Sequence, residues 1–407
     1  MAVRFLNQQL SDLCLGKPAL RPVKETASIA EALAALKRSS ETYVSIWRCS
    51  DHSKEVQRDS DCLCVGKICM VDVICFLCKE ENLGKITKAL EAPVSDILPK
   101  GVPIVRHLEP NSSLLEAIDC ILEGTQNLII PIQQTHMSSR LRRKQLLSPS
   151  NHHGVEYCWL TQEDIVRFLL NSIGVFSPLP TFTIESLGII NRDDIMTILY
   201  HEPSTNALNS ISRAHIQQTS IAVIDDDDNN RLIGEISPFT LSYCEETVSA
   251  AVMTLTAGDL MAYIDCGGPT DDLIELVKQR AGDRNLSALL GVIGEEEEYS
   301  VSSIYSSSSA ASSGSSDDES STLSKSGGSG NYYCLRRSEA ITCYPWSSLV
   351  AVMIQALAHR ASTIWVIQED QSLVGIVTYK EMLRVFRSIA NPLPKTKPGR
   401  DNNAFRQ

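Results

Sequence analysis

The 407-residue sequence lacks any long uninterrupted apolar run. No window approaches the eighteen consecutive apolar residues that a membrane span requires. The amino terminus carries neither the apolar segment of a secretory signal nor an acid-poor targeting leader. Thirteen cysteines, scattered through apolar runs, fit reduced and buried thiols. We therefore expect no membrane partner and a cytoplasmic location, with the nucleus as the alternative.

The sequence is also short of positive charge. It has 37 Lys and Arg residues against 49 Asp and Glu residues, a formal net charge of −12 at neutral pH. Proteins that bind nucleic acid or anionic membranes generally carry an excess of basic residues. Hydrophobic residues make up 43% of the chain and charged residues 21%, as in ordinary globular proteins. We therefore predict a globular protein without a nucleic-acid partner.

The usual catalytic motifs are absent. The phosphate-binding pattern G-x-x-x-x-G-K-[ST], the hydrolase pattern G-x-S-x-G and the metalloprotease pattern H-E-x-x-H do not occur. Cys75 and Cys78 form a single C-x-x-C pair, but they fall on an apolar helix pattern, which favours buried thiols over a zinc site. We predict that the chain is not an enzyme, requires no cofactor and binds no metal.

What the sequence contains is one unit repeated four times, each with the order helix, strand, strand, helix. In the fourth unit an apolar helix pattern at 346–360 precedes two strand-like runs at 362–368 and 372–378 and a closing helix pattern at 379–389. The same order appears at 28–80, at 113–172 and at 204–246, where the closing helix is weaker. Ser28 with Glu31, and Ser113 with Glu116, match the capping box of a helix start.

The four units group into two pairs. The first pair spans residues 11–171, with unit 1 at about 11–80, unit 2 at about 93–171 and a polar insertion at 134–154. A proline-containing linker at 172–183 leads to the second pair at 184–390, with unit 3 at about 184–247 and unit 4 at about 250–390. Within unit 4, residues 295–330 are mostly serine, glycine and acid, a composition typical of disorder. Residues 391–407 are expected to form a flexible tail.

Each unit closes with a variant of G-h-h-[ST]-x-x-[DE], where h is apolar. This pattern resembles the cystathionine-β-synthase (CBS) domain, and four copies in two pairs look like two Bateman modules. The resemblance covers almost everything from Ser11 to Ala390 except the insertions. It implies an α+β fold with two modules stacked through their helices or strands. It also implies clefts that bind AMP, ADP, ATP or S-adenosylmethionine, in which an acid at the second helix takes the ribose hydroxyls.

The four closing motifs differ in the residues that such a cleft would use. Unit 2 has Thr161 and Asp164, and unit 4 has Thr378 and Glu381, so these four residues are the best candidates for binding an adenosine ligand. Unit 1 keeps the acid Asp72 but has Cys69 at the hydroxyl position, and unit 3 has Ser237 but Thr240 in place of the acid. Thr161 with Asp164, and Thr378 with Glu381, are equally the pattern of a helix cap that needs no ligand.

The resemblance implies a non-catalytic regulatory protein that senses an adenosine ligand and changes the activity of a partner protein, with homodimers through CBS modules as a further expectation. One alternative is a γ-type regulatory subunit of an AMP-activated or SNF1-related protein kinase. Against it, few Arg or His residues are expected at the sites, namely Arg167, His201 and Arg384. The other alternative is a structural scaffold whose ligand sites have decayed.

Overall fold

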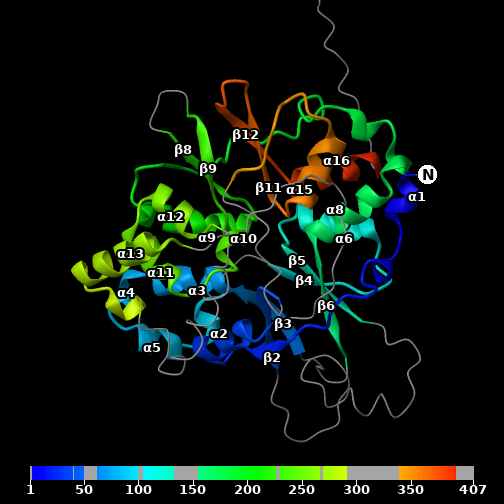
Figure 1. Cartoon of the computed structure of the whole chain (residues 1–407). Helices are drawn as coiled ribbons and strands as arrows, with labels where there is room; N and C mark the ends of the chain where they lie inside the picture. The colour runs from blue at the N-terminus through cyan, green and yellow to red at the C-terminus, as the bar shows by residue number, and fades with distance from the viewer. Residues whose placement is uncertain are drawn as a thin grey trace, which may run out of the picture.

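The computed structural model contains four separate three-stranded sheets (Figure 1). It describes residues 2–39, 41–49, 62–99, 104–132, 155–225, 230–265, 269–290 and 339–390. The sheets are β1–β2–β3 (Pro22–Lys24, Tyr43–Cys49, Cys62–Cys69), β4–β5–β6 (Val105–His107, Asn127–Pro131, Tyr157–Thr161), β7–β8–β9 (Thr197–Leu199, Ile221–Ile224, Leu232–Ile236) and β10–β11–β12 (Thr342–Cys343, Thr363–Ile367, Leu373–Thr378). Each belongs to one of the four predicted units.

The helices follow the predicted order. The first helix of each unit is α2 (Ile29–Lys37), α6 (Leu114–Leu122), α9 (Leu208–Gln217) or α15 (Leu349–Ala358). The second helix is α3 (Met70–Leu77), α8 (Gln162–Asn171), α10 (Pro238–Leu241) or α16 (Tyr379–Ala390). The remaining helices are α1 (Ala2–Leu6), α4 (Glu80–Leu83), α5 (Ile86–Glu91), α11 (Val248–Thr254), α12 (Ala257–Tyr263) and α13 (Asp271–Asp283). The predicted α+β fold of four repeats is confirmed.

The units differ from the prediction in two details. Each sheet has an additional first strand of two or three residues that runs parallel to the second strand, while the second and third strands are antiparallel. So short a strand leaves no periodic pattern in a sequence. The closing helix of unit 3, predicted over 238–246, is the single turn α10. There the Ser242 hydroxyl and the Cys244 thiol donate to the carbonyls of Phe239 and Thr240, which competes with continued helix bonding.

The helix starts show the predicted caps. At Ser28 both halves of the capping box form: its hydroxyl accepts the Glu31 N–H at 3.2 Å, and Glu31 accepts the Ser28 N–H at 3.0 Å. At Ser113 the hydroxyl accepts the Glu116 N–H at 3.1 Å. Ser348 caps α15 in the same manner, although no acid follows it three residues later. Short polar caps thus fix where the first helices begin.

The sheets join the two units of each pair. Trp47 and Cys64 of unit 1 pack against Ile129 and Trp159 of unit 2 in a small apolar cluster. The equivalent cluster in the second pair contains Ala222 and Ile224 of unit 3 with Trp365 and Ile376 of unit 4. We call units 1 and 2 the first module and units 3 and 4 the second module.

The helices join one module to the other. One large core contains helices of units 1 and 3, where α3 packs on α9 and α11. The other contains helices of units 2 and 4, where α16 packs on α6 and α8 (Figure 1). The stacking expected through helices or strands therefore uses helices, and the two modules share two continuous cores.

Segments outside the repeated helix–strand–strand–helix elements also pack with these cores. Residues 2–14 pack with units 2 and 4, and residues 248–290 pack with units 1 and 3. Phe5 stacks on Phe168 at 5.3 Å between ring centroids. In the segment predicted as a linker, Phe176 is buried against Phe386. The predicted unit boundaries stay a prediction. The predicted insertions at 134–154 and 295–330 and the predicted tail at 391–407 lie outside the described residues.

Among the residues that the structure describes, no helix is long and apolar enough to cross a membrane.

Candidate functional site

A cavity of about 470 Å³ lies where the four units meet. Its wall includes Tyr43 and Lys67 from unit 1, and Thr161–Asp164 with Arg167 from unit 2. Unit 3 contributes several residues of the segments 214–219 and 238–243, and unit 4 contributes Arg360, Ser362 and Tyr379. We call this the central cavity. No other described cavity draws residues from all four units.

Each unit presents the start of its second helix to the central cavity. Cys69 precedes α3, Thr161 precedes α8, Pro238 is the first residue of α10 and Tyr379 is the first residue of α16, and all four line the wall. The first turn of a helix has unpaired backbone N–H groups and the positive end of the helix dipole. The ends of α3, α8 and α16 favour an anionic ligand, because each stabilises negative charge, whereas α10 is a single turn whose first residue, Pro238, has no N–H.

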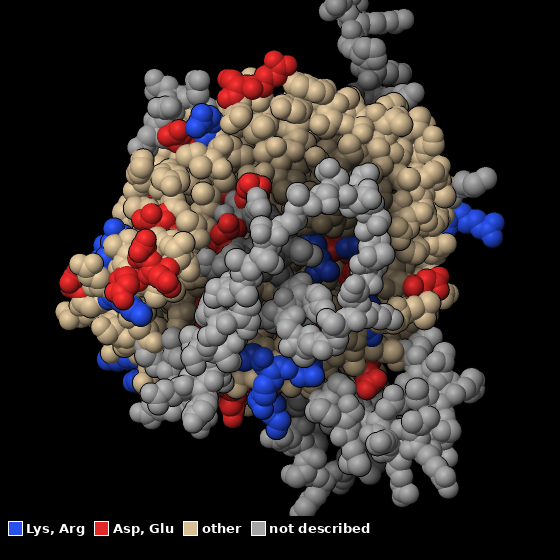
Figure 2. All heavy atoms as spheres, in the orientation of Figure 1, with Lys and Arg blue, Asp and Glu red and all other residues tan. Residues whose placement is uncertain are grey.

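Basic side chains reinforce this preference. Lys17, Lys67, Arg167 and Arg360 line the central cavity, against the three acids Glu41, Glu163 and Asp164. The middle of the face drawn in Figure 2 is hollowed, with Lys or Arg atoms visible inside the hollow. The Lys67 ammonium lies 5.6 Å from the centre of the Tyr43 ring. Burial lowers the pKa of Lys67, with Cys69 and Asp72 acting in the opposite direction. Of the Arg and His residues expected at the sites, Arg167 lines this cavity, where His215 and Arg360 join it, while His201 and Arg384 do not line it.

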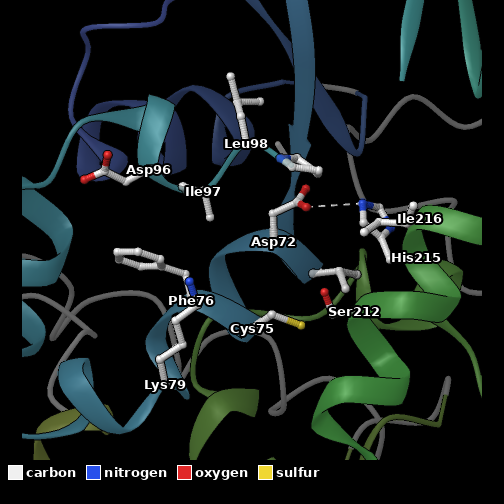
Figure 3. A pocket seen from close by; sticks show the side chains of 12 residues that line it. Asp72, Cys75, Phe76, Lys79, Asp96, Ile97, Leu98, Ser212, His215 and Ile216 are labelled. Carbon is white, nitrogen blue, oxygen red and sulfur yellow. Dashed lines mark ion pairs between the residues drawn. The ribbon is translucent and has the colours of Figure 1, made fainter. Parts of the chain in front are cut away.

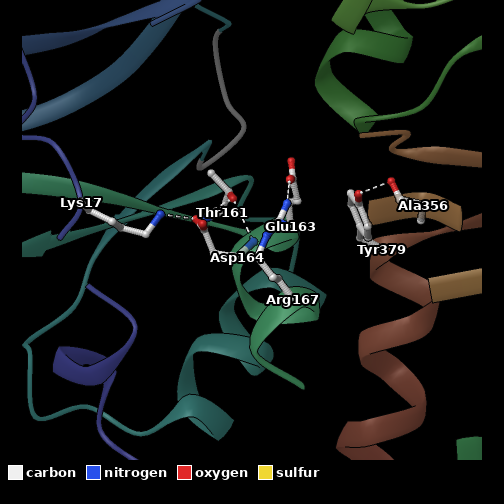
Figure 4. A network of polar contacts seen from close by, with 7 residues as sticks. All are labelled: Lys17, Thr161, Glu163, Asp164, Arg167, Ala356 and Tyr379. Carbon is white, nitrogen blue, oxygen red and sulfur yellow. Dashed lines mark hydrogen bonds and ion pairs between the residues drawn. The ribbon is translucent and has the colours of Figure 1, made fainter. Parts of the chain in front are cut away.

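Aromatic side chains supply apolar surface on the same wall, namely Tyr43, Phe239, Tyr243 and Tyr379. Phe239 and Tyr243 form an edge-to-face pair at 5.1 Å. The Tyr379 hydroxyl donates to the carbonyl of Ala356 at 3.1 Å, which fixes its ring (Figure 4). Burial raises the pKa of Tyr43. These rings can pack against the flat face of a heterocyclic base.

Thr161 and Asp164 lie on the wall of the central cavity and also form a complete capping box. The Asp164 carboxylate accepts the Thr161 N–H and hydroxyl through Oδ2 at 2.8 and 2.7 Å, while Thr161 Oγ1 accepts the Asp164 N–H at 3.2 Å. The Lys17 ammonium approaches the same oxygen at 2.6 Å (Figure 4). Asp164 Oδ1 has no hydrogen bond to any residue that the structure describes. The cap thus leaves one carboxylate oxygen for a ligand.

Thr378 and Glu381 are arranged differently. The Thr378 hydroxyl donates to Glu381 Oε2, and both side chains are buried, at 7% exposure each. Arg384 lies 3.6 Å from Glu381 Oε1. Neither residue lines the central cavity, although the neighbouring Tyr379 does. The two side chains of unit 4 therefore bond to each other and do not line the central cavity.

Asp72 lines a second, smaller cavity of about 330 Å³ between α3 and α9, and points toward His215 (Figure 3). Asp72 Oδ1 lies 3.3 Å from His215 Nε2, and Asp72 Oδ2 accepts the Cys69 N–H at 2.8 Å. Burial acts to raise the pKa of Asp72, but the His215 ring and the Cys69 N–H hold it below its usual value. Burial likewise acts to lower the pKa of His215, but Cys69 and Asp72 outweigh it and raise that pKa.

Ser237, the remaining candidate, is 1% exposed and caps α10 by accepting the Phe239 N–H at 3.3 Å. The structure therefore gathers Thr161 and Asp164 at the central cavity, but not Thr378, Glu381 or Ser237. The wall residues that were not predicted include Lys17, Lys67, His215 and Arg360. The closing motif does not specify the residue type at any of these positions, so the sequence pattern could not predict them.

Comparison with known proteins decides the family. No family model matches the chain. The CBS domain-containing protein CBSX5 of Arabidopsis thaliana is 43% identical over 398 residues, which is 95% of this chain and 98% of that protein. The chain belongs to the CBS domain-containing proteins.

The chain is also similar to two more distant proteins. The SNF1-related protein kinase regulatory subunit gamma-like PV42b of Arabidopsis thaliana is 18% identical over 95% of this chain and 96% of that protein. The crystal structure of MJ1225 from Methanocaldococcus jannaschii superposes with a TM-score of 0.50 at 14% identity, covering 93% of this chain and all of that one. The structural likeness supports the overall fold.

Proposed function

We propose that this CBS protein is a non-catalytic regulatory protein that binds an adenine nucleotide in the central cavity and thereby alters a partner protein. The observation that carries the proposal is the convergence of three helix starts and four basic side chains on one space lined by all four units. A phosphate group suits such a space, because backbone N–H groups, helix dipoles and cations all stabilise its charge.

The same wall offers partners for the rest of a nucleotide. Asp164 Oδ1 is positioned to accept a ribose hydroxyl, since Oδ2 is already held by Thr161 and Lys17. The rings of Phe239 and Tyr243 can pack against the adenine base. The volume of about 470 Å³ lies in the range of small-molecule sites.

Phosphate-bearing ligands fit this cavity better than S-adenosylmethionine. The sulfonium and ammonium groups of that ligand are cationic and would meet Lys67 and Arg360, while Lys17 and Arg167 already pair with Asp164 and Glu163. Like charges within a few ångströms are destabilising. We therefore propose AMP, ADP or ATP as the ligand class.

The position of the cavity supports a regulatory role. A nucleotide there would contact both modules at once, so its binding free energy would depend on how the modules stack. A ligand shifts a conformational equilibrium only through such a difference in affinity. The partner that responds would then recognise one arrangement of the modules over another.

Calorimetric titration of the purified chain with AMP, ADP, ATP and S-adenosylmethionine tests the proposal. We expect saturable binding of one or more of the nucleotides, weakened roughly 10- to 100-fold in Lys67→Ala and Arg360→Ala through loss of charge-assisted contacts. Arg106→Ala is the control, because Arg106 is exposed, pairs with Glu123 and lies outside the cavity. Absence of heat and of a thermal shift with every ligand would favour the scaffold reading.

A second candidate is a γ-type subunit of a SNF1-related kinase. The specific support is the relative PV42b, which aligns along nearly the whole chain and carries that description. Affinity purification of the tagged chain from cells, followed by identification of a kinase catalytic subunit at stoichiometric level, would favour this candidate. A purification without any kinase would count against it while leaving nucleotide binding open.

A further inference from the structure

Cys69, Asp72 and His215 bring three different metal-binding groups together at the junction of the two modules. Cys69 and Asp72 belong to the start of α3 in the first module, and His215 belongs to α9 in the second. The thiol sulfur, one carboxylate oxygen and one imidazole nitrogen all lie within 4.8 Å of one another. Cys69 and Asp72 are 4% and 9% exposed, and the His215 side chain is 16% exposed, so the cluster is largely buried.

Two of the three distances between these atoms match the edges of a tetrahedral metal site. Cys69 Sγ lies 3.6 Å from His215 Nε2, and Asp72 Oδ1 lies 3.3 Å from the same nitrogen. Zinc binds sulfur at about 2.3 Å and nitrogen or oxygen at about 2.0 Å, which puts tetrahedral edges at about 3.5 Å for S···N and about 3.3 Å for N···O. The sulfur and oxygen atoms lie within 4.8 Å of each other, so all three groups can face one cation.

The surrounding contacts orient the ligands. Asp72 Oδ2 accepts the Cys69 N–H at 2.8 Å, which turns Oδ1 toward His215 (Figure 3). A single N–H on His215 Nε2 cannot donate a well-directed hydrogen bond to both the Cys69 thiol and the Asp72 carboxylate, whereas a metal ion can bind all three groups at once. Hydrogen bonds that hold a ligating carboxylate in place are typical of protein metal sites.

We infer that Cys69, Asp72 and His215 bind a zinc-class divalent cation that ties the first module to the second. The combination of thiolate and imidazole selects Zn²⁺ over Mg²⁺ or Ca²⁺, which prefer oxygen ligands. On binding, the metal replaces the protons on Cys69 Sγ and His215 Nε2, and a water completes the fourth position. Cys69 and His215 also line the central cavity. This inference does not depend on nucleotide binding.

Zinc titration of the full-length chain, stripped with a chelator and monitored by competition with a chromophoric chelator, tests the site. We expect one high-affinity equivalent in the wild-type chain and at least about tenfold weaker binding in Cys69→Ser and His215→Gln. Cys75→Ser is the matched control, because Cys75 lies on the same helix but outside the cluster, and it should bind as the wild type does. Mg²⁺ should not compete.

X-ray absorption at the zinc edge of the wild-type chain gives a test that needs no variant. We expect one sulfur and two or three nitrogen or oxygen neighbours. A shell with several sulfurs would place zinc at other thiols and overturn the inference. Unchanged affinity in Cys69→Ser, or no binding at micromolar zinc, would also overturn it. Melting of the metal-free variants near the wild-type temperature checks that they fold.

Discussion

Replacing Phe386 with alanine tests whether the two modules share one core. Phe386 lies on α16 of unit 4, is fully buried, and contacts Phe176 edge-to-face at 4.9 Å between ring centroids. Its helix packs on α6 and α8 of unit 2, in the other module. Loss of a buried phenylalanine ring costs about 3–5 kcal/mol through lost transfer energy and the cavity left behind.

Hydrogen exchange followed by mass spectrometry measures where this destabilisation appears. Because 1.4 kcal/mol corresponds to a tenfold change in an equilibrium, the slowest amides should exchange roughly 100- to 4,000-fold faster. We expect this acceleration in α6 and α8 as well as in α15 and α16, since one core spans both modules.

Ile354→Ala provides the matched control. Ile354 lies on α15 and is 51% exposed, so its truncation should change stability by no more than about 0.5 kcal/mol. If Phe386→Ala accelerated exchange in α15 and α16 while α6 and α8 kept their wild-type rates, the modules would be energetically independent and the shared core would be refuted.

Three further predictions concern packing and charge. Gly375→Ala should destabilise the chain by about 1–3 kcal/mol in urea unfolding, because a Cβ there would lie 2.6 Å from the Ile190 side chain and 2.7 Å from the Asn191 carbonyl oxygen. Gly282→Ala is the control: this helical site has open space around it, so the change should be neutral or stabilise the chain by up to about 1 kcal/mol. Trp365→Phe should lower the free energy of unfolding by about 1.5–3 kcal/mol, because the Trp365 Nε1–H donates to the buried Glu235 carboxylate at 2.7 Å. The same change made in a Glu235→Gln background should lower it by less, and an equal loss in both backgrounds would count against this cause. AMP affinity, measured by calorimetry, should fall as salt rises from about 0.05 to 0.5 M, since part-exposed cations are screened; a salt-independent affinity would speak against phosphate recognition.

The repeated unit and its element order could be predicted because they rest on local patterns. Apolar periodicity and the repeated closing motif identify strands and helices such as β11, β12 and α16 without any tertiary information. The capping box at Ser28 is likewise local, since all its partners lie within three residues. The short first strands leave no such pattern, and only pairing with the next strand defines them.

The site could be predicted only in part, because its composition depends on how the modules stack. Thr161 and Asp164 were accessible from the motif, and they line the central cavity. The same motif in unit 4 gives a Thr378–Glu381 pair that closes on itself, a difference that depends on burial. Lys17 reaches Asp164 across 147 residues of sequence, and His215 reaches Asp72 from another module. Such long-range contacts have no local signature.

The most direct test of the central claim is to locate a bound adenine nucleotide on the chain. Photolabelling with 8-azido-AMP, followed by peptide mapping, should mark peptides that line the central cavity, chiefly residues 161–167, 214–219 and 238–243, and excess AMP should protect them. Labelling that AMP does not reduce, or that falls only on peptides away from this cavity, would contradict the assignment.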